Sequence, residues 1–123
     1  MLSLPLSRIL VCTRHADLRK SFDGLAQMVR EFLGADPLSG HLFVFRNKRG
    51  DRVKLLYWDS DGLAIWYKRL EQGTFRFPVA TAGHAVEIRG ADLTMLLDGV
   101  DLESVKRQRR YRRPQPADAS AAS

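Results

Sequence analysis

Residues 41–69 constrain the fold more than any other part of the chain. They form three segments rich in aromatic and β-branched residues, separated by clusters of turn residues at 47–51 and 59–62. This pattern is typical of strands joined by short turns. Because connections this short join only antiparallel neighbours, the stretch predicts an antiparallel β-meander.

Two helices are expected to pack on this sheet, which makes the predicted fold class α+β. The first is one long amphipathic helix, expected to run from an N-cap at Asp17 to a stop at Gly34. Its apolar positions recur at spacings of three and four; they are Leu18, Phe22, Leu25, Val29 and Phe32. Residues 91–98 predict a short C-terminal helix, and residues 9–12 and 86–88 predict short strands.

Cations gather where the first helix is predicted to begin. Arg19 and Lys20 lie in its first turn, where the helix dipole disfavours positive charge. With Arg14 they form a possible anion site at the helix N-terminus; the alternative is a set of solvated cations near Asp17. Gly24 would cost the helix about 1 kcal/mol relative to alanine, which indicates that another group approaches the backbone there.

The length of 123 residues predicts one domain, and the positive charge is concentrated at its end. Residues 1–103 carry 14 Lys/Arg and 13 Asp/Glu, whereas the last twenty residues carry six and one. We therefore divide the chain into a single α+β domain at 1–104 and a basic, largely disordered tail at 105–123. The tail cations are expected to bind nucleic-acid phosphates, so that log affinity falls with log salt concentration at a slope of roughly −5. These cations are Lys106, Arg107, Arg109, Arg110, Arg112 and Arg113.

One face of the predicted meander combines cations with two tryptophans. Alternation along the strands places these residues together: Arg46, Arg52, Lys54, Trp58, Trp66 and Lys68. The opposite face is predicted to be the core; it carries Phe43, Phe45, Val53, Leu55, Tyr57, Leu63, Ile65 and Tyr67. Basic groups beside exposed rings suit a polyanion whose bases can stack. The alternative is that Trp58 and Trp66 pack beneath a helix.

The sequence contains no complete catalytic motif. Cys12 and His15 lack the second pair that a zinc site needs, and Asp59–Gly62 is better explained as a hairpin turn than as a calcium loop. We predict a protein that is not an enzyme and needs no metal or cofactor. A metal-dependent nuclease is kept as an alternative, using Asp17, Asp23, Asp59 or Asp61. The single cysteine, and the absence of a signal peptide or membrane span, predict a soluble cytoplasmic protein.

Several motifs resemble a known family. Residues 17–25, Asp-Leu-Arg-Lys-Ser-Phe-Asp-Gly-Leu, are similar to its motif Asp-Met-Arg-Lys-Gly-Phe-Asp-Gly-Leu, departing at Leu18 and Ser21. Residues 39–46, 49–52, 56–59 and 61–71 resemble the rest of its core. The family is that of the small accessory protein TnpB, or Orf-two protein, of insertion sequence 66 transposable elements, and the resemblance covers about residues 5–103.

The resemblance implies a role in transposition, a form of DNA recombination, beside a separate and larger transposase that carries the catalytic acids. Element-end DNA and that transposase are the partners it implies. The RNA-guided nuclease that shares the name TnpB is far longer, and its activity is not carried over. Two functions follow: a factor that binds nucleic acid non-specifically, or a module that bridges transposase subunits through a patch of Val44, Leu56, Trp58 and Trp66. The oligomeric state stays open.

Overall fold

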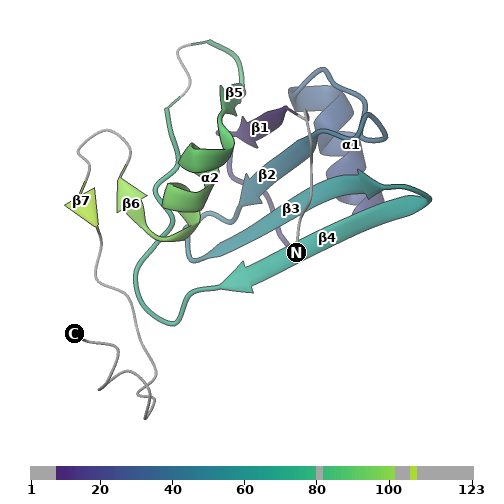
Figure 1. Cartoon of the computed structure of the whole chain (residues 1–123). Coiled ribbons are helices and arrows are strands. Elements are labelled where there is room, and N and C mark those ends of the chain that lie inside the picture. Colours follow the sequence, from purple (N-terminus) through teal and green to yellow (C-terminus); the bar gives the residue numbers. More distant parts are fainter. Residues whose placement is uncertain (1–7, 80–81, 102–105, 108–123) are drawn as a thin grey trace.

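The computed structural model describes residues 8–79, 82–101 and 106–107, and a five-stranded sheet forms its centre (Figure 1). The sheet order is β4-β3-β2-β1-β5. Its strands are β1 (Ile9–Cys12), β2 (Leu42–Arg46), β3 (Arg52–Asp59), β4 (Gly62–Arg69) and β5 (Ala85–Ile88). The helices are α1 (Phe22–Phe32) and α2 (Gly90–Leu97), and a small separate sheet pairs β6 (Val100–Asp101) with β7 (Lys106–Arg107).

The sheet is mixed, which confirms the α+β class but corrects the prediction of a purely antiparallel sheet. β2, β3 and β4 pair antiparallel in succession through their two turns. β1 pairs parallel with β2 and antiparallel with β5. The parallel pair arises because α1 connects β1 to β2, and a crossover of this kind returns the chain in the same direction.

Helix α1 is shorter than the predicted long helix. It begins at Phe22 with Ser21 at the N-cap, so the prediction of an N-cap at Asp17 is wrong. The Asp17 carboxylate instead accepts a hydrogen bond from the Arg19 backbone N–H at 3.0 Å. Such local side-chain bonds compete with helix formation. Residues 17–20 therefore form a separate turn, closed by Lys20 N donating to Asp17 O at 3.0 Å.

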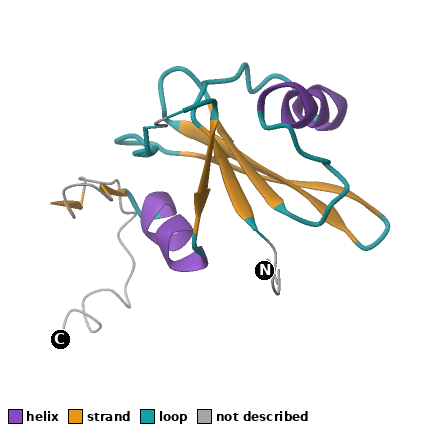
Figure 2. Cartoon of the chain, turned by 90° about the horizontal axis from the view of Figure 1, so that it is seen from above, coloured by secondary structure: helices purple, strands orange, loops and turns teal. Residues whose placement is uncertain are grey.

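The two helices lie on opposite sides of the sheet, so both of its faces are buried (Figure 2). On the α1 side, helix residues pack with strand residues such as Phe43, Phe45 and Leu56. On the α2 side, Leu93 and Leu96 pack with Val44, Leu55 and other strand residues. Two cores separated by one sheet hold the molecule together.

Because both faces of the sheet are buried, the sequence pattern predicted the residues of β3 on the opposite faces. The predicted faces are correct for β2 and β4, but β3 is inverted: Phe45 pairs with Lys54, and Val44 pairs with Leu55. Alternation defines faces only within a strand, while the turn sets how the faces of two strands match. When both faces are apolar, hydrophobicity does not identify the side.

The end of the chain is described in part. β7 contains Lys106 and Arg107, the first cations of the predicted tail, and it pairs antiparallel with β6. The predicted tail residues 108–123 lie outside the described residues. Within the described part of the chain, no helix has the length and apolar character needed to cross a membrane.

Candidate nucleic-acid interface

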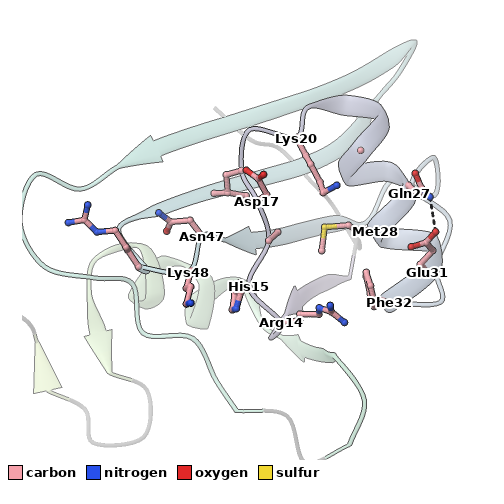
Figure 3. A pocket seen from close by; sticks show the side chains of 14 residues that line it. Arg14, His15, Asp17, Lys20, Gln27, Met28, Glu31, Phe32, Asn47 and Lys48 are labelled. Atoms are coloured by element: carbon pink, nitrogen blue, oxygen red, sulfur yellow. Dashed lines mark hydrogen bonds between the residues drawn. The ribbon is translucent and has the colours of Figure 1, made fainter.

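A groove of about 650 Å³ lies where the parallel strands β1 and β2 end (Figure 3). Residues 14–18 follow β1, residues 47–49 follow β2, and one side of α1 closes the groove. Its lining consists of Arg14, His15, Ala16, Asp17, Leu18, Lys20, Gly24, Gln27, Met28, Glu31, Phe32, Asn47, Lys48 and Arg49. We call this the basic groove. Its place at the carboxyl ends of adjacent parallel strands is where open α/β sheets bind their ligands.

The two loops that form the groove are held together by backbone contacts. Ala16 N donates to Arg46 O at 2.8 Å, which ties the segment after β1 to the end of β2. Ala16 and Leu18 are buried in the α1-side core. The loop therefore has little freedom to move away from the strand beside it.

The turn between β2 and β3 is built around Asn47. Its Oδ1 accepts from Gly50 N and Arg52 N, both at 3.0 Å, and its Nδ2 donates to Asp51 Oδ1 at 2.7 Å. The backbone around it is held as well, since Phe75 N donates to Gly50 O at 2.8 Å. Asparagine is favoured at such places because its side chain can satisfy the backbone of the turn. Lys48 and Arg49 thus project from a fixed frame.

Positive charge dominates the basic groove. Four cations line it, namely Arg14, Lys20, Lys48 and Arg49. Within residues 8–79, 82–101 and 106–107, none of the four makes an ion pair with a carboxylate. The groove can therefore offer these charges to an anionic ligand.

The two carboxylates of the groove are already engaged. Asp17 accepts a two-pronged contact from the Arg19 guanidinium, with Nη2 to Oδ2 at 2.7 Å and Nε to Oδ1 at 3.0 Å. The hydrogen bonds from Arg19 lower the pKa of Asp17 to about 2. Glu31 accepts from Gln27 Nε2 at 2.7 Å. The positive charge of Arg19 therefore offsets the negative charge of Asp17, which reduces the repulsion that Asp17 would exert on an anion.

Lys20 reaches the groove along the start of α1. A Cβ added at Gly24 would lie 3.0 Å from Lys20 Cβ and 3.1 Å from its Cγ. The predicted close approach at Gly24 is thereby confirmed, and the approaching group is the aliphatic part of Lys20. Glycine at this position leaves room for that side chain beside the helix.

Aromatic contacts hold the far end of the groove. The Arg14 guanidinium carbon lies 4.5 Å from the centroid of the Phe32 ring, and the His84 ring meets Phe32 edge-on at 5.7 Å. A stacked guanidinium keeps its planar N–H donors directed around the ring edge. Arg14 is thus packed on Phe32 while its N–H donors stay available for hydrogen bonds.

A second hollow of about 420 Å³ continues from the basic groove, because both are lined by Asp17, Leu18, Asn47 and Arg49. It adds Arg19, Asp51, Arg52 and Tyr67. Arg52 Nη1 donates to the Tyr67 hydroxyl at 2.9 Å. The Lys54 ammonium lies 4.8 Å from the Tyr67 ring centroid. The two hollows together offer an extended basic path with one exposed aromatic ring.

The structure brings the residues of the predicted anion site together. Arg14 and Lys20 line the basic groove, and Arg19 lines the second hollow while it binds Asp17. The site differs from the expectation in that a second structural element also contributes cations to it. The cations that complete it, Lys48 and Arg49, come from the β2–β3 turn rather than from the helix.

The predicted basic and aromatic sheet face does not exist as one surface. Because β3 is inverted, the residues divide between the two sides: Arg52, Lys54 and Trp58 lie on the α1 side, and Arg46, Trp66 and Lys68 on the α2 side. Trp58 is half-buried and Trp66 is 36% exposed.

Two of those predicted sheet cations have structural contacts instead. Lys54 is only 8% exposed, and its Nζ donates to Lys20 O at 2.8 Å. Arg46 Nη2 donates to Thr13 O at 3.1 Å, its guanidinium lies 5.4 Å from the Phe77 ring centroid, and its Nε is buried without a hydrogen-bond partner among the described residues. Both side chains hold loops against the sheet.

Sequence reasoning missed Asn47, Lys48, Arg49 and Tyr67 as site residues. It treated the first three only as turn residues and placed Tyr67 in the core. Two adjacent cations at a turn tip were the available signal. Only the parallel β1–β2 pairing, which alternation does not reveal, brings that tip beside α1.

The described residues contain no group of three or more His, Cys, Asp or Glu side chains that could hold a metal ion. Asp59 and Asp61 lie at the turn between β3 and β4, whereas Asp17 precedes α1 and Asp23 lies in its first turn. These four carboxylates form no such group.

The fold and groove define a small α+β protein with a basic surface. Residues 7–107 match the family described as IS66 Orf2 like protein, TnpB_IS66. The chain therefore belongs to this family, as the motifs predicted, and membership supports a role as a transposition accessory protein.

Two similar proteins come from Sinorhizobium fredii (strain NBRC 101917 / NGR234), and both are named as uncharacterized. Protein y4jC is 41% identical over 101 residues, which cover 82% of this chain and 86% of y4jC. Protein y4hO is 42% identical over 94 residues, covering 76% of this chain and 81% of y4hO. No solved structure matches the chain.

Proposed function

We propose that this protein is a non-catalytic accessory factor of an insertion sequence that binds nucleic acid non-specifically and assists a separate transposase. The basic groove is its main contact within the described residues. The observation that carries the proposal is the set of four cations, Arg14, Lys20, Lys48 and Arg49, which line one groove and form no ion pair among the described residues.

The chemistry of the groove suits a phosphate backbone. Lysine and arginine contacts to phosphates supply affinity without reading sequence. If the four cations each neutralise one phosphate of duplex DNA, log affinity should fall with log salt at a slope of about −4. Tail cations beyond residue 107 would steepen that slope in the full chain.

Fluorescence anisotropy of the full chain with labelled duplexes tests the proposal. One duplex has the sequence of an element end and the other an unrelated sequence of equal length, each measured over a salt series. The double variant Lys48→Ala/Arg49→Ala should lose about 10-fold in affinity, and its salt slope should be shallower by about 2. Both duplexes should bind alike.

A matched control removes the same charge elsewhere. Arg30 and Arg76 are exposed and do not line the groove. The variant Arg30→Ala/Arg76→Ala should keep nearly the full salt slope. Absence of binding at low salt would end the proposal, and equal losses in the two double variants would assign binding to net charge rather than to the groove.

A second candidate function is that of a module bridging transposase subunits. The observation that favours it is the exposure of Trp66 and Tyr67 on β4. The predicted docking patch also included Val44 and Leu56, but both are completely buried and cannot contact a partner. Co-purification with the transposase that persists in high salt and is lost in Trp66→Ala would favour bridging over the groove.

A further inference from the structure

Strand β4 forms one edge of the sheet, and no described strand covers its outer side (Figure 1). It is eight residues long, whereas β5 at the other edge has four. Edge strands present a row of unpaired backbone N–H and C=O groups, and natural proteins usually shorten, bend, cover or charge them. The charged residues of β4, Lys68 and Arg69, lie at one end only. β4 contains no proline, and Trp66, Tyr67, Lys68 and Arg69 are all exposed. A long open edge of this kind can add another strand.

We propose that two copies of this chain associate by antiparallel pairing of β4 with β4, which joins their sheets into one. The occupant of the edge is thus a second copy of the same protein. The two copies would be related by a two-fold axis perpendicular to the sheet, the symmetry most common among oligomers.

The charges at the two ends of β4 favour the antiparallel direction. Asp59, the last residue of β3, and Asp61 in the turn are exposed just before β4 begins, and Lys68 and Arg69 are exposed at its end. Arg69 also contacts Glu71 at 3.0 Å, whereas Lys68 makes no ion pair with a described carboxylate. Antiparallel pairing sets the acidic end of one copy against the basic end of the other. Parallel pairing would set like charges together, which destabilises a sheet.

A register centred on Ile65 makes the strand complementary to itself. Since directly opposed residues share a face, Asp61 would oppose Arg69 of the second copy and Leu63 would oppose Tyr67 on the α1 side. On the α2 side the small Ala64 would oppose the large Trp66. Every pair then joins opposite charges, two apolar groups, or a small residue with a large one, apart from Gly62 with Lys68.

The dimer has a geometric consequence for the basic groove. A two-fold axis perpendicular to the sheet keeps the α1 helices of both copies on the same side. Two grooves would then open on one face of the assembly and could bind one nucleic acid together. The association itself does not depend on nucleic-acid binding, so it is tested separately.

Sedimentation velocity of the full chain without nucleic acid, from about 1 to 500 µM, measures the association. An interface formed by one strand edge is small, and small interfaces are weak or transient, so a reversible monomer–dimer equilibrium is expected in this range. Hydrogen exchange of β4 amides should slow as concentration rises, while exchange in β5 stays unchanged.

Charge exchange tests the register. Asp61→Arg or Arg69→Asp alone should weaken dimerisation about five- to thirty-fold, because each change acts at two symmetric pairs, and the combined variant should restore it. Arg76→Asp, a remote exposed position, is the matched control and should have little effect. Circular dichroism confirms that each variant folds.

Three results would overturn the proposal. The first is a protein that stays monomeric over the whole concentration range. The second is association without slower exchange in β4, which would place the interface elsewhere. The third is a combined variant no better than the single ones, which would exclude this register.

Discussion

Replacing Asn47 by alanine should destabilise the β2–β3 turn of the basic groove, and it should lower the free energy of unfolding more than Lys48→Ala does. The substitution removes three hydrogen bonds, at 2.7, 3.0 and 3.0 Å, from a half-buried side chain. Each such bond contributes about 1 kcal/mol net, and water replaces part of them at this exposure. We expect the free energy of unfolding to fall by about 2 kcal/mol, and the midpoint of thermal unfolding by about 10 °C.

Urea and thermal unfolding of the full chain, followed by circular dichroism, measure this loss. Lys48→Ala is the control, because it changes the neighbouring exposed side chain and should stay within about 0.5 kcal/mol. Asn47→Asp keeps the acceptor oxygen but sets a second carboxylate against Asp51 in place of the donor, so it should be less stable than Lys48→Ala. An Asn47→Ala protein as stable as the Lys48→Ala protein would refute this account of the turn.

The same substitution should alter the pH dependence of stability. The hydrogen bond from Asn47 lowers the pKa of Asp51 below its ordinary value of 3.8. A carboxyl whose pKa is lower in the folded chain stabilises it above the ordinary value, and that contribution is lost as pH falls through the lowered pKa. Between pH 5 and about 2, the free energy of unfolding should therefore fall less in Asn47→Ala than in the unchanged protein. An identical loss would show that this bond does not act on Asp51.

Three further predictions concern other parts of the chain. Ser60 has a φ of 56°, where glycine is strain-free, so Ser60→Gly should raise the free energy of unfolding by up to about 1 kcal/mol in urea titrations; a loss would contradict the strain. NMR titration should place the pKa of Asp17 at about 2, and Arg19→Ala should raise it toward 3.8; an unchanged midpoint would exclude the Arg19 contact as its cause. Gly24→Ala should gain less than the about 1 kcal/mol expected from helix propensity, because its Cβ would crowd Lys20; a full gain in urea titrations would show that Lys20 moves aside freely.

Local patterns predicted the elements well and their assembly poorly. The strands at 9–12 and 86–88, the hairpins and the second helix all follow from nearby residues, and the structure contains them. The start of α1 was misplaced because the Asp17 carboxylate accepts a hydrogen bond from the backbone of a separate turn rather than from the first turn of the helix.

The candidate site was only partly predictable for the same reason. Arg14, Arg19 and Lys20 are close in sequence, so their clustering could be expected. Their meeting with Lys48 and Arg49 depends on the parallel pairing of β1 with β2, a contact between distant segments. The inverted β3 shows that a sheet covered on both sides conceals which face is which.

The position of β1 between β2 and β5 has a consequence for how the chain folds. Ile9 pairs with Leu42 on one side and with Ile88 on the other, and Arg8 joins Glu87 across 79 positions of sequence. Contacts between such distant segments slow folding, whereas hairpins close early. During synthesis the β2–β4 hairpins can form while β1 still lacks one neighbour. The sheet is complete only after residue 88 has left the ribosome.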